Sequence, residues 1–79
     1  MQRFGEKLRI LRQRRGMTLR EVATALGFRS HGFVGDLESG RKHPSLELAV
    51  QIADFFGVSV DQLARDDQDV DDTKHGAEK

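Results

Sequence analysis

Short apolar stripes with helical spacing constrain this chain more than any other feature, because each is bounded by residues that start or stop a helix. In the first stripe, Phe4, Leu8 and Leu11 recur at the i, i+4, i+7 spacing that places side chains on one face of a helix. Gly16 follows and is typical of a helix end. The pattern predicts a first helix over residues 2–15.

Four further stripes each lie beside a Ser or Thr that can cap a helix N-terminus. Thr18 and Glu21 match a capping box, and Ser59 and Gln62 match a second one. The stripes comprise Val22, Ala23 and Leu26; Phe33, Val34 and Leu37; Leu46, Ala49, Ile52, Ala53 and Phe56; and Val58, Val60 and Leu63. We therefore expect four more helices: from Thr18 to Gly27, over His31–Ser39, from Ser45 to Gly57, and a short one after Ser59.

The last fourteen residues have a different composition. Five Asp fall within residues 66–72, and the only aliphatic side chain larger than Ala is Val70. Such a segment buries too little apolar surface to offset the entropy of ordering it. The sequence predicts one all-α domain over residues 1–65 and a disordered acidic tail over residues 66–79.

Composition argues against several functional classes. The chain has no Cys, and His31, His43 and His75 share no i, i+4 helical face, so we expect no metal site and no cofactor. No nucleophile, base and carboxylate are spaced as a catalytic set, so no enzymatic activity is expected. There is no apolar run of about 18 residues and no apolar signal segment, so we expect a cytoplasmic protein without membrane contact.

The formal net charge of zero conceals an asymmetry along the chain. Residues 1–44 hold ten Lys and Arg against four Asp and Glu, whereas residues 45–79 hold three against nine. A basic half can attract a polyanion whatever the net charge, because the local field decides. The alternative explanation is that these cations only solvate exposed helix faces.

Four motifs in a fixed order point to a known family. They are Thr18-x-x-Glu21-Val22-Ala23-x-x-Leu26-Gly27, Val34-x-x-Leu37-Glu38-Ser39-Gly40-Arg41, Pro44-Ser45-Leu46 and Ile52-Ala53-x-x-Phe56-Gly57-Val58-Ser59-x-Asp61-x-Leu63. Together they resemble the lambda-repressor-like, Cro/C1-type helix-turn-helix family, also called the xenobiotic-response-element family. The resemblance covers about residues 4–63 and implies a five-helix DNA-binding domain.

In this family the third helix enters the major groove and the second crosses the DNA backbone. The resemblance also implies an ion pair between Arg12 and Glu38, which would join the first helix to the end of the third. Candidate phosphate contacts are Arg9, Arg14, Arg15, Thr18, Arg20, Ser30, Arg41, Lys42 and His43. Leu19 departs from the family, which often has a phosphate-binding Gln there.

The residues aligned with the base-reading positions are unusual. They are His31, Gly32, Gly35 and Asp36, with Arg29 and Phe33 beside them. The first four cannot supply the long bidentate donors of a Gln–adenine or Arg–guanine contact. Three explanations stay open: the glycines let the backbone sit deep in the groove, specificity comes from DNA shape and phosphate contacts, or the domain binds a protein instead of reading bases.

The resemblance also implies partners for this domain. Double-stranded DNA is the expected ligand, bound as an inverted repeat by a homodimer. Candidate dimer residues are Phe55, Val58, Val60 and Leu63. The expected function is a sequence-specific regulator, a repressor, in a prokaryote or phage and associated with the nucleoid. An antitoxin with a toxin partner, a restriction-modification controller, and a protein adaptor or partner of a co-regulator are the alternatives.

Overall fold

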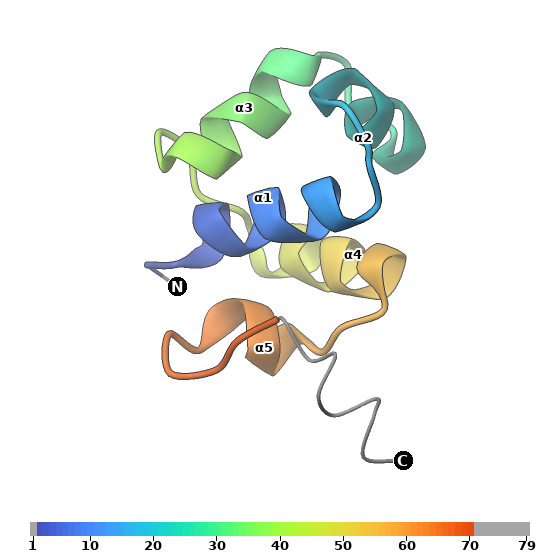
Figure 1. The fold of residues 1–79 in the computed structure, drawn as a ribbon. Coiled ribbons are helices and arrows are strands. Elements are labelled where there is room, and N and C mark those ends of the chain that lie inside the picture. The colour runs from blue at the N-terminus through green and yellow to red at the C-terminus, as the bar shows by residue number, and fades with distance from the viewer. Residues whose placement is uncertain (1, 71–79) are drawn as a thin grey trace.

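A computed structural model describes residues 2–70, which form five α-helices in the predicted order (Figure 1). The helices are α1 (Phe4–Arg14), α2 (Leu19–Leu26), α3 (His31–Ser39), α4 (Leu46–Phe56) and α5 (Val60–Ala64). Residues 2–70 contain no strand, so the prediction of an all-α helix-turn-helix domain is confirmed. The bounds of α3 are those predicted, and α1 is shorter than predicted at both ends.

Side-chain caps start four of the helices, which explains why the sequence located them well. In α2, Thr18 Oγ1 accepts from the Glu21 backbone N–H at 3.0 Å, and Glu21 Oε1 accepts from the Thr18 N–H at 2.8 Å. Ser59 and Gln62 form the same reciprocal pair at the start of α5. Gly57 ends α4 with φ +71°, a left-handed conformation that a side chain would strain.

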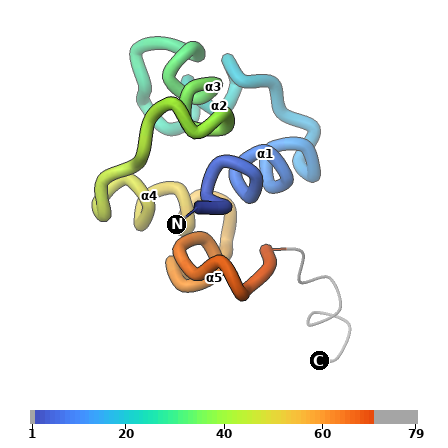
Figure 2. The backbone as a smooth tube through the Cα atoms, turned by 90° about the vertical axis from the view of Figure 1, so that its left-hand side faces the viewer, coloured from blue at the N-terminus to red at the C-terminus, as the bar shows by residue number. Residues whose placement is uncertain are grey.

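The helices stack so that α2 and α3 form one end of the molecule and α5 the other, with α1 and α4 between them (Figures 1 and 2). Leu8, Val22, Val34 and Ile52 are each completely buried, so the first four helices contribute to one core. Because α3 packs against both α2 and α1, its position is fixed from two sides.

Leu46 and Leu63 each differ from one prediction made for them, Leu46 from helical spacing and Leu63 from the family resemblance. The spacing predicted that Leu46 belongs to the buried stripe of α4, yet it is 72% exposed. It is the first residue of α4 and lies beyond the area that the other helices cover. Leu63, a predicted dimer residue, is completely buried in the core. It therefore offers no surface to a partner, and that prediction is wrong.

The packed part of the chain continues beyond α5 to Val70. Val70 is only 1% exposed and lies in the core, although the sequence assigned it to the tail. Arg3 supports this segment, because its backbone N–H donates to Asp66 Oδ1 at 3.0 Å and its guanidinium donates to the Asp66 carbonyl at 2.9 Å. Residues 66–70, which the sequence predicted to be disordered, are therefore packed against the domain. The rest of the predicted tail, residues 71–79, lies outside the described residues.

Candidate nucleic-acid interface

Residues 27–30 connect α2 to α3, and contacts of Ser30 and Phe28 attach this turn to α3. Ser30 caps α3, as its Oγ accepts from the Gly32 N–H at 2.9 Å. Phe28 and Phe33 meet edge to face with ring centroids 5.0 Å apart, which is a geometry that aromatic pairs prefer. The turn thereby fixes the direction in which the N-terminus of α3 points.

An ion pair joins the inner side of α3 to α1. Arg12 Nε donates to Glu38 Oε2 at 2.6 Å and Arg12 Nη2 donates to Glu38 Oε1 at 3.1 Å. The Glu38 side chain is 3% exposed and that of Arg12 is 16% exposed. Hydrogen bonding to Glu38 raises the pKa of Arg12, against the opposing effect of burial. The residues that the family resemblance paired are thus in direct contact, in the bidentate geometry that makes such pairs strong.

The backbones of α1 and α3 approach each other closely at Gly5. A Cβ placed there would lie only 2.4 Å from the carbonyl oxygens of both Leu37 and Glu38. No side chain can move to relieve that contact, because both atoms belong to the backbone of α3. Gly5 therefore allows the depth at which α3 sits on α1.

The outer side of α3 has a different character. His31 and Gly32 are exposed, and Gly35 and Asp36 are half-buried. A Cβ on Gly35 would meet only Leu19 Cδ1 at 3.8 Å, which is an ordinary van der Waals contact. Packing within this domain therefore does not require a glycine at position 35. Of the four positions aligned with base-reading residues, Gly32 and Gly35 present bare backbone, and neither His31 nor Asp36 is a long donor.

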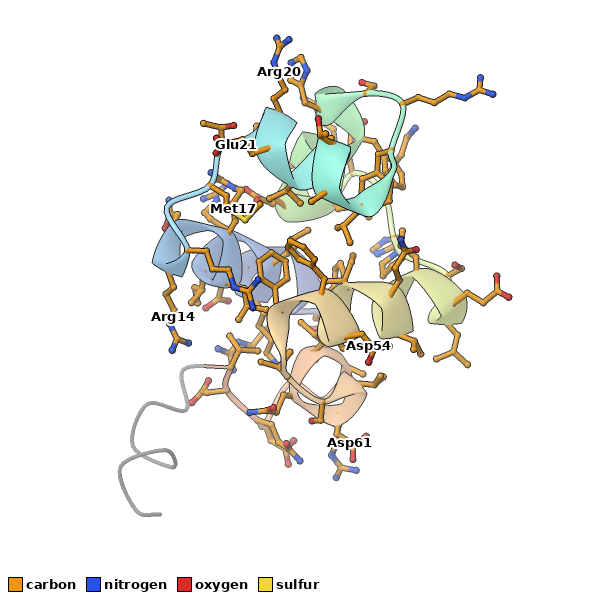
Figure 3. All side chains as sticks on the ribbon, turned by 90° about the vertical axis from the view of Figure 1, so that its right-hand side faces the viewer. Arg14, Met17, Arg20, Glu21, Asp54 and Asp61 are labelled. Atoms are coloured by element: carbon orange, nitrogen blue, oxygen red, sulfur yellow. The ribbon has the colours of Figure 1, made fainter. Side chains whose placement is uncertain are left out.

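Cations border the outer side of α3. Arg20 projects from α2 away from the rest of the molecule (Figure 3). Arg29 is exposed in the turn before α3, and Arg41, Lys42 and His43 are exposed in the loop after it. Lys42 Nζ lies 5.6 Å from the centroid of the Phe33 ring, so a cation–π contact holds it beside α3. We call Arg20, Arg29, Arg41 and Lys42 the basic rim.

Three other arginines predicted to contact phosphates have partners within the protein. Arg9 Nε lies 3.4 Å from Glu38 Oε1, with a side chain that is 55% exposed. Arg14 donates to the Val70 carbonyl at 2.9 Å and points away from Arg20 (Figure 3). The Arg15 guanidinium lies over the rings of Phe55 and Phe56. The structure does not bring Arg14 or Arg15 together with the outer side of α3.

The three remaining dimer candidates are half-buried. Phe55 meets Phe56 edge to face at 4.9 Å, and Val58 and Val60 pack beside the core. Within residues 2–70, the large hydrophobic side chains that are clearly exposed are those of Leu46 and Val50 on α4.

Sequence reasoning missed Gly5 and Lys7. Lys7 is completely buried, and its Nζ donates to the carbonyl oxygens of Gln62 at 2.6 Å and Arg65 at 2.5 Å, at the end of α5. Desolvation lowers the pKa of this ammonium. One signal was present, because Lys7 falls three residues after Phe4 on the apolar face of α1. No group of three His, Asp or Glu side chains within residues 2–70 is placed to hold a metal ion.

The comparison with known proteins identifies the family. A family model described as a helix-turn-helix domain matches residues 3–65. This chain belongs to that helix-turn-helix family. The matched residues include α1 to α5 and thus both sides of α3.

Several relatives carry names that describe regulators. The chain is 43% identical over 58 residues to the HTH-type transcriptional regulator DdrOP3 of Deinococcus deserti, covering 73% of this chain and 44% of that protein. It is 32% identical over 65 residues to the cryptic phage CTXphi transcriptional repressor RstR of Vibrio cholerae, covering 82% of this chain and 58% of that protein. It is 34% identical over 61 residues to the uncharacterized HTH-type transcriptional regulator YazB of Bacillus subtilis, covering 77% of this chain and 87% of that protein. The chain thus spans about half the length of the first two relatives.

Proposed function

We propose that this chain is a non-enzymatic, sequence-specific DNA-binding regulator of transcription that places α3 in the major groove. The arrangement of α3 carries the proposal. Its inner side is fixed by Gly5 and the Arg12–Glu38 pair, while its outer side is open and bordered by the basic rim. A helix held in this way can enter a groove without losing its support, as helix-turn-helix proteins require.

The names of the relatives support the regulatory role. Regulators and a repressor are named among them, and we propose that this chain also represses, from within the cytoplasm and at the nucleoid. A domain of this size buries little surface on DNA, so we propose that it binds an inverted repeat as a homodimer. None of the helices in residues 2–70 is long and apolar enough to cross a membrane.

Base recognition rests on three features. Gly32 and Gly35 let the backbone of α3 approach the base edges closely. His31, exposed at the first position of α3, donates to guanine N7 or O6. The basic rim supplies phosphate contacts that position α3 but do not specify the sequence.

The first experiment selects ligands from random duplex DNA with the purified chain and measures the enriched sequences by salt-titrated fluorescence anisotropy. We expect an inverted repeat that binds at least about a thousandfold more tightly than random duplex. Four rim contacts per domain predict a log–log salt slope of about −4 for each domain, at about −0.9 per phosphate.

Matched variants separate the two kinds of contact. Arg41→Ala should weaken binding to all sequences and reduce the salt slope by about 0.9 for each domain. His31→Ala should instead change the preferred base at one position of each half-site. Arg65→Ala is the control, because Arg65 is an exposed cation directly after α5. Helix α5 lies at the end of the molecule remote from α3 (Figure 1). Enrichment of no sequence at moderate salt would contradict the proposal.

A protein-binding role is the second candidate, and Asp36 is the observation that favours it. This carboxylate lies on the outer side of α3, where it repels DNA phosphates. An adaptor or antitoxin would show only weak, sequence-blind and salt-sensitive DNA binding. Asp36→Asn distinguishes the two roles: it should strengthen DNA binding in a regulator and leave an adaptor without sequence preference.

A further inference from the structure

An apolar side chain lies beside the predicted base-reading positions, on the outer side of α3. Leu19 is the first residue of α2 and is half-buried. A Cβ built on Gly35 would lie 3.8 Å from Leu19 Cδ1 and would meet no other group of a neighbouring helix or loop in residues 2–70 within 4 Å. The place of the missing side chain is therefore open, large enough for a methyl group and bounded by Leu19. We call it the Gly35 gap.

The Gly35 gap has a fixed wall and lies within the surface that we propose for DNA. Leu19 packs against the hydrophobic core, and α2 packs directly on α3, so the two sides of the gap are held together. Gly35 is four residues after the exposed His31, so both lie on the same face of α3. Arg20, the residue after Leu19, projects from α2 away from the rest of the molecule (Figure 3). A duplex that contacts both His31 and Arg20 therefore covers the gap.

The chemistry of the Gly35 gap selects one kind of group on a base edge. Leu19 offers only hydrocarbon, and Gly35 has no side chain that could donate or accept a hydrogen bond. A polar group of a base would lose water there without gaining a hydrogen bond from either side chain, which is unfavourable. Among the groups that base pairs present in the major groove, the C5 methyl of thymine is the apolar one. It has the size that the gap admits.

We propose that Leu19 contacts the C5 methyl of one thymine in each half-site of the operator, across the Gly35 gap. This inference rests on the proposed function, in which α3 enters the major groove, and it names a base that the site recognises. Gly35 then has two effects: it lets the backbone of α3 come close to the bases, and it uncovers Leu19. Helix α2 thereby contributes a specificity-determining side chain in addition to phosphate contacts.

The test removes the methyl group from the DNA. Deoxyuridine replaces each thymine of the selected operator in turn; it lacks only the C5 methyl and keeps the hydrogen-bonding groups of thymine. Fluorescence anisotropy at fixed salt measures the affinity of each duplex. At one thymine position of each half-site, we expect the affinity to fall about fourfold, as loss of one buried methyl group predicts. The salt slope should stay the same, because no phosphate contact is lost.

Matched variants assign the effect to the wall of the gap. Leu19→Ala should bind the thymine and deoxyuridine operators equally tightly, because the group that contacts the methyl is gone. Leu48→Ala is the control: Leu48 is also a half-buried leucine, but it lies on α4, and this variant should keep the fourfold difference. Gly35→Ala fills the gap with its own methyl and should lose the difference as well. Thermal melts confirm that each variant is folded.

The outcomes separate this inference from the proposed function. Deoxyuridine without effect at every thymine of an enriched operator would overturn the inference and leave the proposed function standing. A Leu19→Ala variant that keeps the fourfold difference would also overturn it, because the methyl would then contact another side chain. Enrichment of no operator at all would reject both the inference and the proposed function.

Discussion

On its inner side, α3 presents two backbone carbonyls to Gly5 of α1; on its outer side, α3 itself carries Gly32 and Gly35. A side chain at Gly5 would lie 2.4 Å from those carbonyl oxygens, whereas one at Gly35 would lie 3.8 Å from its nearest neighbour. Packing thus demands a glycine on the inner side and does not demand one at Gly35. Glycine weakens a helix interior, and packing within residues 2–70 does not account for Gly35. An approaching DNA duplex is our proposed explanation.

The largest effect should come from Gly5→Ala, which attacks the inner side directly. The added methyl forces α1 and α3 apart, so we expect a loss of about 3 kcal/mol in the free energy of unfolding, at the upper end for overpacked sites. For a domain of this size, the melting temperature should fall by more than about 10 °C. A thermal melt followed by circular dichroism measures the melting temperature. A fall of less than about 2 °C would contradict the inference that packing requires a glycine at position 5.

Glu38→Gln tests the polar half of the inner side. The variant removes the negative charge that accepts two hydrogen bonds from Arg12 at a nearly buried position. We therefore expect the free energy of unfolding to fall by about 2 kcal/mol. Glu6→Gln is the matched control, because Glu6 pairs with Arg3 while its side chain is 57% exposed. Such exposed pairs contribute little, and its loss should stay below about 1 kcal/mol. Urea unfolding of both variants gives the comparison, and equal losses would contradict it.

A double-mutant cycle attributes the Glu38 effect to its partner. Arg12→Gln is combined with Glu38→Gln, and the coupling free energy should exceed about 0.5 kcal/mol if the two side chains act as a pair. A coupling near zero would mean that Glu38 stabilises α3 by other contacts.

Val70→Ala tests whether the cooperatively folded unit extends beyond the helices. Val70 packs in the core and its carbonyl accepts from Arg14 on α1. Loss of two buried methyl groups and the resulting cavity should reduce the free energy of unfolding by about 2 kcal/mol. Val50→Ala is the control, since Val50 is 39% exposed on α4. Equal urea midpoints for the two variants would place residue 70 outside the cooperative unit.

The helices were predictable from the sequence because caps and apolar stripes are local signals. Ser30 and Ser59, for example, lie next to the backbone groups they cap, so spacing alone identified them. The role of Gly5 was not predictable, because a close approach depends on where α3 lies, and nothing near Gly5 in the chain encodes that. Val70 was missed for a related reason: an acidic run predicts disorder, and only the fold reveals the space that one aliphatic side chain fills.

The candidate site was predictable only in part. Of the predicted phosphate contacts, Arg20, Arg41 and Lys42 border α3, whereas Arg14 and Arg15 lie elsewhere. Their positions follow from the helical phase at the end of α1, where a step of one residue turns a side chain by about 100°. Arginines that are close in the sequence, such as Arg12, Arg14 and Arg15, therefore point in different directions and have different partners.

The smallest effect, and the one with the sign reversed, should come from Gly35→Ala. Alanine is a better helix former and its methyl only touches Leu19, so the free energy of unfolding should rise by about 0.5–1 kcal/mol. Gly5→Ala makes the same chemical change in the same domain and should have the opposite effect.

The stabilised Gly35→Ala variant is also a sensitive test of how α3 reads DNA. If the backbone of α3 lies against the base edges, the methyl must reduce affinity for the selected operator while the salt slope stays the same, because no phosphate contact is lost. Anisotropy at fixed salt measures the affinity, and a thermal melt confirms that the variant is folded. Unchanged operator affinity would show that the outer glycines do not serve close approach. Recognition would then have to come from DNA shape or from the turn, where Arg29 precedes α3.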